Sequence, residues 1–327
     1  MCSLAVCVLL HIEIERYHMN TLSGELIVMR SHEHAHEAEL FLDAEAILAE
    51  GPCWNAEQGK LYWVDIQGEK FCRVDPRTGL NEVFPIGKPV GAVVCAGGER
   101  VMLATKDGFE SYDCSTQQLT SVVDPEAHLP ENRFNDGKCD SAGRLWAGTM
   151  EAVEVHVCGS LYVLEADCSY RKMHDDVFVS NGLAWSPDDK EMYYIDSMKQ
   201  TVTAFEFDVL TGSISNPRLL IDFQSEPGYP DGMTVDEEGM LWIAHWDGWQ
   251  VSRWDPRTGR KIDSVFVPAA KATSCAFGGE NLDILYITTA RVGLDEEQLS
   301  NQPHAGGIYS FKPGVKGTRT YSFGEMK

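Results

Sequence analysis

The sequence predicts an all-β fold, a six-bladed β-propeller of four-stranded antiparallel blades. Three observations predict it: a β-type segment recurs six times, its period lies in the forties, and turn-forming residues separate the strands within each repeat. The steps between the segments are 40, 44, 47, 49 and 44 residues, and the segments begin at Leu61, Val101, Leu145, Met192, Leu241 and Leu285. Such a period with several strands per repeat is typical of propeller blades. Equivalent positions of the blades should therefore line one central channel.

One repeat shows how a blade is encoded. Residues 183–185 begin an inner strand, and a Ser-Pro-Asp-Asp turn separates them from a second strand at 192–196. Proline presets the backbone of such turns, and the Asp side chains bond to it locally. Alternating residues at 201–207 predict the third strand, and residues near 218–222 form the outer edge. Five tryptophans at strand positions are predicted to pack between blades: Trp63, Trp146, Trp185, Trp242 and Trp254.

The two ends of the chain are predicted to close the ring. Residues 38–43 are suited to add an outer strand beside residues 307–311 of the last blade, which would remove two exposed sheet edges. Residues 1–37 do not fit the repeat, so we expect a poorly ordered leader there and a single propeller domain over 38–327.

Composition limits the partners and the compartment. The 327 residues carry a formal charge of −23, which opposes binding to nucleic acid and to anionic lipid surfaces. No apolar run reaches the 18 residues that a membrane span needs. The ten cysteines are scattered and form no Cys-x-x-Cys pair, so we expect reduced thiols and a cytoplasmic protein. The sequence does not predict the oligomeric state.

Four oxygen-bearing side chains occupy the same phase of the repeat. Glu50, Asn135, Asn181 and Asp231 are separated by 85, 46 and 50 residues, which correspond to two periods, one period and one period. Equal phase in a propeller means equal height on the channel wall, so these side chains should converge. The alternative is that Asn-Gly and Asp-Gly mark ordinary turns, but their matching phase favours a shared site.

This set of ligands suits a divalent cation. Carboxylate and amide oxygens are hard ligands, and water or substrate would complete the shell around one ion; Ca²⁺, Mg²⁺, Mn²⁺, Zn²⁺ and Fe²⁺ are not distinguished. Arg133 lies beside this set in sequence, although a surface salt bridge would also account for an arginine there. The equivalent entrances of blades 2 and 6 carry no charge, which leaves room for a ligand on that side.

At these positions the chain resembles the gluconolactonase/regucalcin-like family of sugar lactone hydrolases, also called the senescence-marker family. The matching strings are AEGPCW, NRFNDGKCDSAGRLWAGTM, SNGLAWSPD, YPDGMTVDEEGMLWIAHWDG and LYITTARVGL. The resemblance implies a six-bladed propeller with one divalent metal ion in its channel. It implies Glu50, Asn181 and Asp231 as metal ligands, and it implies that Arg133, Asn135 and Glu151 hold a sugar lactone.

The implied reaction is hydrolysis of the lactone to the aldonic acid. The metal would polarise the carbonyl, water would attack it, and Asp231 is the candidate general base; activation of the water by the cation itself is the competing version. No Ser-His-Asp pattern or Gly-x-Ser-x-Gly elbow is present, which disfavours an acyl-enzyme. The alternatives are a phosphotriesterase or aryl esterase on the same propeller, a calcium-binding regulatory protein without turnover, and a protein-binding platform.

Overall fold

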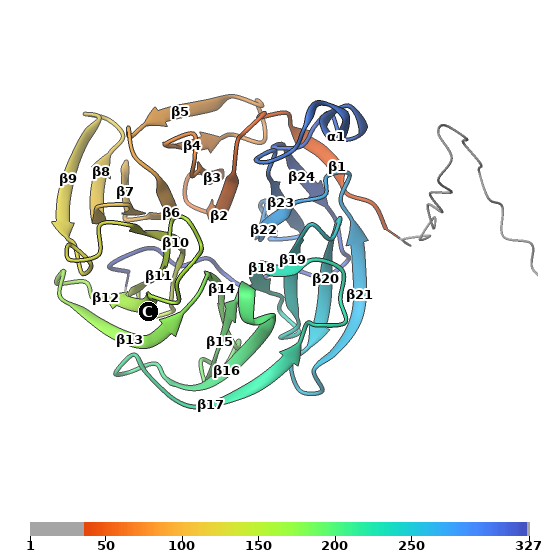
Figure 1. Cartoon of the computed structure of the whole chain (residues 1–327). Helices are drawn as coiled ribbons and strands as arrows, with labels where there is room; N and C mark the ends of the chain where they lie inside the picture. Colours follow the sequence, from red (N-terminus) through yellow and green to blue (C-terminus); the bar gives the residue numbers. More distant parts are fainter. Residues whose placement is uncertain (1–35, 326–327) are drawn as a thin grey trace, which may run out of the picture. The chain divides into compact units, whose positions relative to one another are not determined.

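The computed structural model describes residues 36–325 and confirms the predicted fold. Six four-stranded antiparallel sheets stand around a central axis, so that each sheet forms one blade of a propeller (Figure 1). Five blades are made of consecutive strands, and the sixth combines strands from both ends of the chain.

Each blade begins at the axis and ends at the rim. The first three blades contain β2 (Ala49–Asn55), β3 (Lys60–Asp65), β4 (Lys70–Val74) and β5 (Asn81–Pro85); β6 (Val90–Cys95), β7 (Arg100–Thr105), β8 (Gly108–Asp113) and β9 (Gln118–Val123); and β10 (Asn132–Cys139), β11 (Leu145–Glu151), β12 (Gly159–Leu164) and β13 (Tyr170–Val177). The other three contain β14 (Ser180–Trp185), β15 (Glu191–Asp196), β16 (Thr201–Asp208) and β17 (Ser213–Asp222); β18 (Tyr229–Val235), β19 (Leu241–Trp246), β20 (Gln250–Asp255) and β21 (Arg260–Phe266); and β22 (Ala272–Gly278), β23 (Ile284–Thr289), β24 (Ile308–Phe311) and β1 (Glu39–Leu42). A 3₁₀ turn, η1 (Ser197–Lys199), follows β15, and a short helix, α1 (Glu296–Asn301), precedes β24.

The recurring segments of the sequence are the second strands of the blades. They are buried on both faces because each blade packs against its neighbours, and every residue of β11 is buried. The five predicted tryptophans are all buried, and Trp63, Trp146 and Trp242 are among the largest fully buried side chains. Packing between blades therefore explains the aromatic and β-branched residues of the repeat.

The ring closes as predicted. β1 pairs antiparallel with β24, with Glu39 opposite Ser310 and Leu40 opposite Tyr309. The predicted leader lies outside the described residues except for its last two. There, Phe266 donates a backbone hydrogen bond to the carbonyl of His36. The boundary between leader and propeller stays a prediction.

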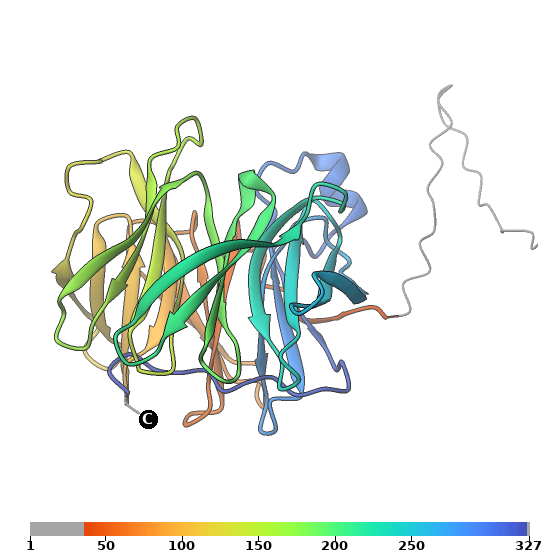
Figure 2. The same cartoon turned by 90° about the horizontal axis from the view of Figure 1, so that it is seen from below.

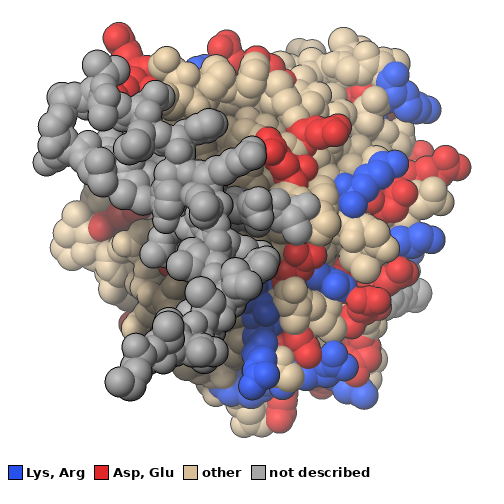
Figure 3. Space-filling view, turned by 90° about the vertical axis from the view of Figure 1, so that its right-hand side faces the viewer, with Lys and Arg blue, Asp and Glu red and all other residues tan. Residues whose placement is uncertain are grey.

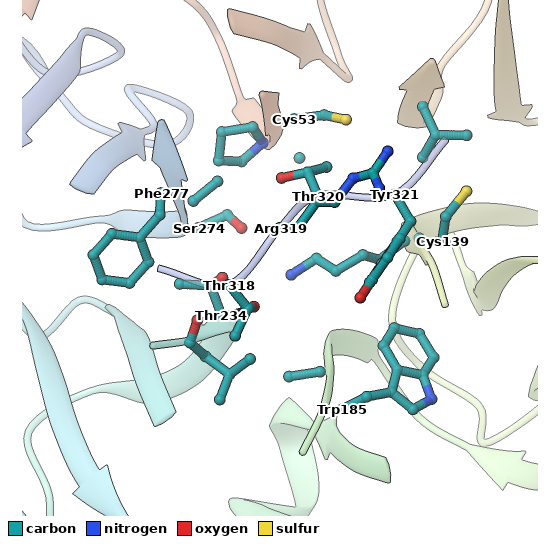
Figure 4. Close-up of a pocket in the computed structure, with 18 of the residues that line it drawn as sticks. Cys53, Cys139, Trp185, Thr234, Ser274, Phe277, Thr318, Arg319, Thr320 and Tyr321 are labelled. Carbon is teal, nitrogen blue, oxygen red and sulfur yellow. Dashed lines mark hydrogen bonds between the residues drawn. The ribbon is translucent and has the colours of Figure 1, made fainter. Parts of the chain in front are cut away.

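The C-terminal segment crosses the lower face of the ring, as Figure 2 shows. Gly317 bridges to Asp236 of blade 5, Phe323 N donates to the Cys95 carbonyl of blade 2, and Gly324 N donates to the Gly143 carbonyl of blade 3. This segment lines a cavity of about 290 Å³ together with Cys53, Cys139 and other residues from the later parts of the inner strands (Figure 4). It therefore ties distant blades together across one end of the channel.

The surface is charged but mixed in sign. Figure 3 shows acidic and basic side chains interspersed on one side of the propeller. No helix within residues 36–325 is long and apolar enough to cross a membrane. The eight cysteines in this range are all free thiols, six of them buried, as expected for small core residues.

Blades 3 and 5 each have a buried aspartate at the same position, in the turn between their first two strands. Asp140 accepts hydrogen bonds from Arg144 Nε at 2.6 Å and from Trp146 Nε1 at 2.8 Å. In blade 5, Asp236 likewise accepts from Trp242 Nε1 at 3.0 Å. The common pattern Asp-x-x-Gly-x-Leu-Trp thus pairs a carboxylate with the indole that packs between blades.

We expect Asp140→Ala to lower the free energy of unfolding by about 3–5 kcal/mol, because it leaves a buried guanidinium and a buried indole N–H without their acceptor. Urea denaturation measures the change. The matched control is Asp113→Ala, which removes an exposed turn carboxylate bonded to Ser115 and should cost about 1 kcal/mol or less. Equal losses in the two variants would contradict this role of Asp140.

Candidate functional site at the channel axis

A break in strand register recurs at one height in all six inner strands. In β10 the shift lies between Phe134 and Asp136, so Asn135 has no partner in the ladder. The shifts in β14 and β18 likewise span Asn181 and Asp231, and that in β2 follows Glu50. A β-bulge re-aims side chains that would otherwise alternate between the faces of the sheet. The bulges therefore explain how side chains of blades 1, 3, 4 and 5 reach the channel at one height.

The side chains at this height line a cavity of about 280 Å³. Glu50, Asn135, Asn181 and Asp231, which the sequence placed at equal phase, all line it, and so does Arg133. The structure therefore brings together five of the six predicted site residues. The upper cavity, as we call this one, lies at the starting ends of the inner strands, whereas the cavity of Figure 4 lies farther along the same strands.

The glycines after Asn181 and Asp231 lie in strands, not in hairpin turns. A Cβ on Gly182 would lie 2.8 Å from the Asp231 carbonyl oxygen, and one on Gly232 would collide with the Ser274 side chain. These glycines thus let neighbouring inner strands approach closely at the axis. Close approach, and not turn formation, explains the Asn-Gly and Asp-Gly pairs.

A chain of hydrogen bonds links the substrate candidates to a metal candidate. Arg133 Nη1 donates to Asn135 Oδ1 at 2.6 Å, and Asn135 Nδ2 donates to the Ser180 carbonyl at 2.8 Å and to Asn181 Oδ1 at 3.3 Å. Burial lowers the pKa of Arg133 to about 10, and the charges of Glu154 and Glu50 oppose that shift. The guanidinium is therefore charged at neutral pH and held in place by the amide beside it.

Ser197 is a site residue that the repeat pattern did not indicate. Its hydroxyl donates to the Pro230 carbonyl at 2.6 Å and accepts from Asn181 Nδ2 at 2.8 Å. Because the hydroxyl proton is donated to Pro230, Ser197 can only accept from Asn181. The Asn181 amide nitrogen therefore faces Ser197, and its Oδ1 is the atom left to bind a metal ion. Its only signal in the sequence is a position directly after a second strand, and serine is common in such turns, so that position alone does not indicate a site.

Burial disfavours the charged forms of the two predicted carboxylates. Burial raises the pKa of Glu50 to about 8, and repulsion from Asp136 adds to the effect. Burial also raises the pKa of Asp231 well above its usual range, reinforced by the charge of Glu50 and then of Asp136. Asp136 is thus a third acid close enough to act on the predicted pair, which sequence phase did not indicate. Lys138, on the same strand as Asp136, donates to the Met233 carbonyl at 2.6 Å.

These residues fit a hard divalent cation. Within residues 36–325 no three His, Cys, Asp or Glu side chains group to hold a metal, so a site here depends on Asn181 as its third protein ligand. Two buried carboxylates with raised pKa values lie beside an oriented amide oxygen, and a positive charge would stabilise this set in its ionised form. Glu50, Asn181 and Asp231 are the residues that would hold the ion.

The structure does not bring Glu151 into the upper cavity. Its carboxylate accepts hydrogen bonds from the backbone N–H groups of Val155 and His156, both at 2.8 Å, and lies 2.8 Å from His156 Nδ1. These contacts lower its pKa and fold the loop that follows β11. Glu154, three residues later in that loop, lines the cavity instead and has a left-handed backbone at φ 57°. Its approach to the cavity depends on the loop, which the repeat did not predict.

Blades 2 and 6 contribute no ligand at this height. A Cβ on Gly91 would collide with the Phe134 carbonyl, so only glycine fits there. The hydroxyl of Thr273 donates to the Ala49 carbonyl at 2.6 Å and lies 2.8 Å from Thr288 Oγ1. The expected asymmetry of the ring therefore has a physical cause: one position has no side chain and the other has its hydrogen bonds satisfied.

The fold and the site together define a six-bladed propeller with a buried, acid-lined cavity on its axis. The chain belongs to the SMP-30/gluconolactonase/LRE-like family, whose sequence model matches residues 48–291. Regucalcin of Oryctolagus cuniculus is 42% identical over 293 residues, which cover 87% of this chain and 97% of that protein. The protein named "Putative sugar lactone lactonase YvrE" of Bacillus subtilis (strain 168) is 40% identical over 274 residues, covering 84% and 94%.

Solved structures share the architecture. A luciferin-regenerating enzyme matches with a TM-score of 0.83 at 34% identity, covering 88% of this chain and 98% of its own. A calcium-binding protein, regucalcin from Agrobacterium tumefaciens, matches with a TM-score of 0.84 at 27% identity, covering 88% and 97%. A gluconolactonase from Xanthomonas campestris matches at 22% identity with a TM-score of 0.68, covering 84% and 88%, and shows the shared fold.

Proposed function

We propose that this protein is a cytoplasmic lactonase that opens a sugar lactone to its aldonic acid with one divalent cation held by Glu50, Asn181 and Asp231. The observation that carries the proposal is the upper cavity itself. It places two buried carboxylates and an oriented amide beside the Arg133–Asn135 pair. The relative named as a sugar lactone lactonase supports the substrate class.

The residues have distinct tasks in this reaction. Arg133 would donate hydrogen bonds to the ring oxygen or hydroxyls of the lactone. Asn135 would accept one from a hydroxyl at Oδ1, because its two N–H groups already donate to the Ser180 carbonyl and to Asn181. The two side chains are already fixed relative to each other. Asp231 would take the proton of the attacking water, because it is a buried carboxylate that lines the cavity. A bound divalent cation would polarise the lactone carbonyl and stabilise the negative charge that develops on its oxygen.

Acid release from a panel of aldonolactones tests the proposal. We expect turnover of at least one lactone in the presence of Ca²⁺, Mg²⁺, Mn²⁺ or Zn²⁺, loss of turnover with a chelator, and recovery when the cation is restored. Calorimetric binding of a cation without opening of any lactone would support a calcium-binding protein without turnover. An aryl ester or phosphotriester hydrolysed faster than every lactone would support the esterase alternative.

Glu154, not Glu151, is the glutamate that we expect to contact substrate. We expect Glu154→Gln to raise KM for a polyhydroxylated lactone about fivefold to tenfold with little change in kcat, because it removes a charged acceptor for substrate hydroxyls. The comparison variant is Glu151→Gln, which keeps the Glu154 carboxylate but weakens the loop that carries it, so it should raise KM less than Glu154→Gln does. The reverse pattern of KM values would restore Glu151 as the substrate residue.

A further inference from the structure

One side of the upper cavity is apolar. Leu48, Ile66 and Trp246 line it, and we call these three residues the apolar wall. Leu48 and Ile66 are 7% and 1% exposed and belong to the core cluster between blades 1 and 2, against which Trp246 packs. Arg133 and Asn135, from blade 3, line the same cavity, and Met150, Val179 and Met198 add further apolar surface to it. The cavity therefore offers both apolar surface and fixed polar groups to a ligand.

The apolar wall has few hydrogen-bonding groups left for a ligand. The backbone N–H of Leu48 donates to Asp65 Oδ1 at 3.0 Å, and that of Ile66 donates to the Leu48 carbonyl at 3.0 Å. The indole Nε1 of Trp246 is the one side-chain donor that these three residues possess. A substrate hydroxyl directed at this wall would lose water and find at most that donor, which disfavours it.

Trp246 is held as a rigid surface. Lys271 Nζ lies 4.6 Å from the centroid of its ring and donates to the Val292 carbonyl at 2.7 Å. This cation–π contact fixes one face of the indole, so the apolar surface is formed before substrate arrives. A preformed apolar surface in a cavity that also has fixed polar groups selects ligands that have one carbon-rich edge.

We propose that the substrate of this site is an amphiphilic sugar lactone, hydroxylated where it meets Arg133 and Asn135 and deoxy or alkyl-bearing where it meets the apolar wall. The inference rests on the proposed lactonase function and narrows its substrate class. A fully hydroxylated aldonolactone fits less well, because one of its hydroxyls must face the wall. Trp246 is then a specificity-determining residue, and it does not take part in the proton transfers.

Matched pairs of lactones test the inference. L-Rhamnono-γ-lactone and L-fucono-γ-lactone differ from L-mannono-γ-lactone and L-galactono-γ-lactone only by a methyl group in place of the terminal hydroxymethyl group. We expect kcat/KM of the native protein to be about fivefold to tenfold higher for the deoxy member of at least one pair. A preference of that size for the hydroxylated members of both pairs, or equal rates in both, would overturn the inference while leaving a lactonase in place. No hydrolysis of these four lactones, while another aldonolactone of the panel is hydrolysed, would overturn the inference alone. No hydrolysis of any lactone of the panel with cation present would overturn both proposals.

Variants assign the preference to the wall. Trp246→Ala should bring the ratio within a pair close to one, and Trp246→Phe should keep it, because phenylalanine retains an apolar face without the indole donor. The matched control is Trp249→Ala, which removes a neighbouring indole that stacks on Phe266 and does not line the cavity. This variant should leave the ratio of kcat/KM values within a pair unchanged. If Trp246→Ala does not fold, Ile66→Thr serves instead: it keeps the branch at Cβ, removes one methyl group, adds a hydroxyl and should shift the ratio toward the hydroxylated member. An unchanged ratio in a folded Trp246→Ala or Ile66→Thr protein would overturn the assignment.

Discussion

Asp231→Ala should reduce kcat for lactone hydrolysis about a thousandfold, the largest effect that we expect of any single substitution. The variant loses a cation ligand and the proposed general base together, and a positioned base alone is worth about a hundredfold to ten-thousandfold. Steady-state acid release at saturating substrate and cation measures the loss. The matched control is Asp247→Asn, which changes an aspartate in the loop after β19 and should keep nearly full activity.

Asp231→Asn separates the two roles of the residue. The amide retains an oxygen ligand but cannot accept the proton of water. We expect calorimetry to show cation binding that is weakened yet measurable, while kcat at saturating cation stays about a hundredfold or more below that of the native protein. Recovery of native kcat by added cation alone would show that Asp231 is only a ligand and that the base lies elsewhere.

Glu50→Gln should have opposite effects on stability and on cation binding. In the protein without bound cation, the pKa of Glu50 is raised to about 8 by burial and by the charge of Asp136. A carboxyl whose folded pKa exceeds its unfolded value binds more protons in the folded state, so stability falls as pH rises from about 4.5 to about 8. The glutamine has no charge to bury. The free energy of unfolding of Glu50→Gln, measured by urea denaturation at pH 8, should therefore exceed that of the chelated native protein by about 2 kcal/mol or more. Its cation affinity should fall about a hundredfold, because a charged ligand is lost.

A second buried glutamate provides the control. Glu126 accepts hydrogen bonds from Asn132, Thr149 and Tyr162, each at 2.9 Å, so its charge is compensated by donors. Glu126→Gln should therefore lower stability by about 1–2 kcal/mol and leave cation affinity unchanged. Chelated Glu50→Gln protein that is no more stable than the chelated native protein at pH 8 would show that Glu50 carries no buried charge there.

The sequence determined the ring and the position of the candidate site on it. Its period indicated six blades, and equal phase placed Glu50, Asn135, Asn181 and Asp231 at one height, because a propeller repeats the same geometry in every blade. The closing strand was also predictable, since residues 38–43 have strand character and lie outside the six repeats. These features depend on periodicity, which a single chain displays directly.

Only the tertiary structure decided the features that break the period. Glu154 lines the upper cavity and Glu151 does not, because hydrogen bonds within one loop turn the backbone there. Asp136 joins the acid pair because a bulge shifts the register of β10, and the C-terminal segment crosses to blades that are distant in sequence. Contacts within one irregular loop, a local bulge and packing between distant blades set these features, and the period of the repeat does not encode them.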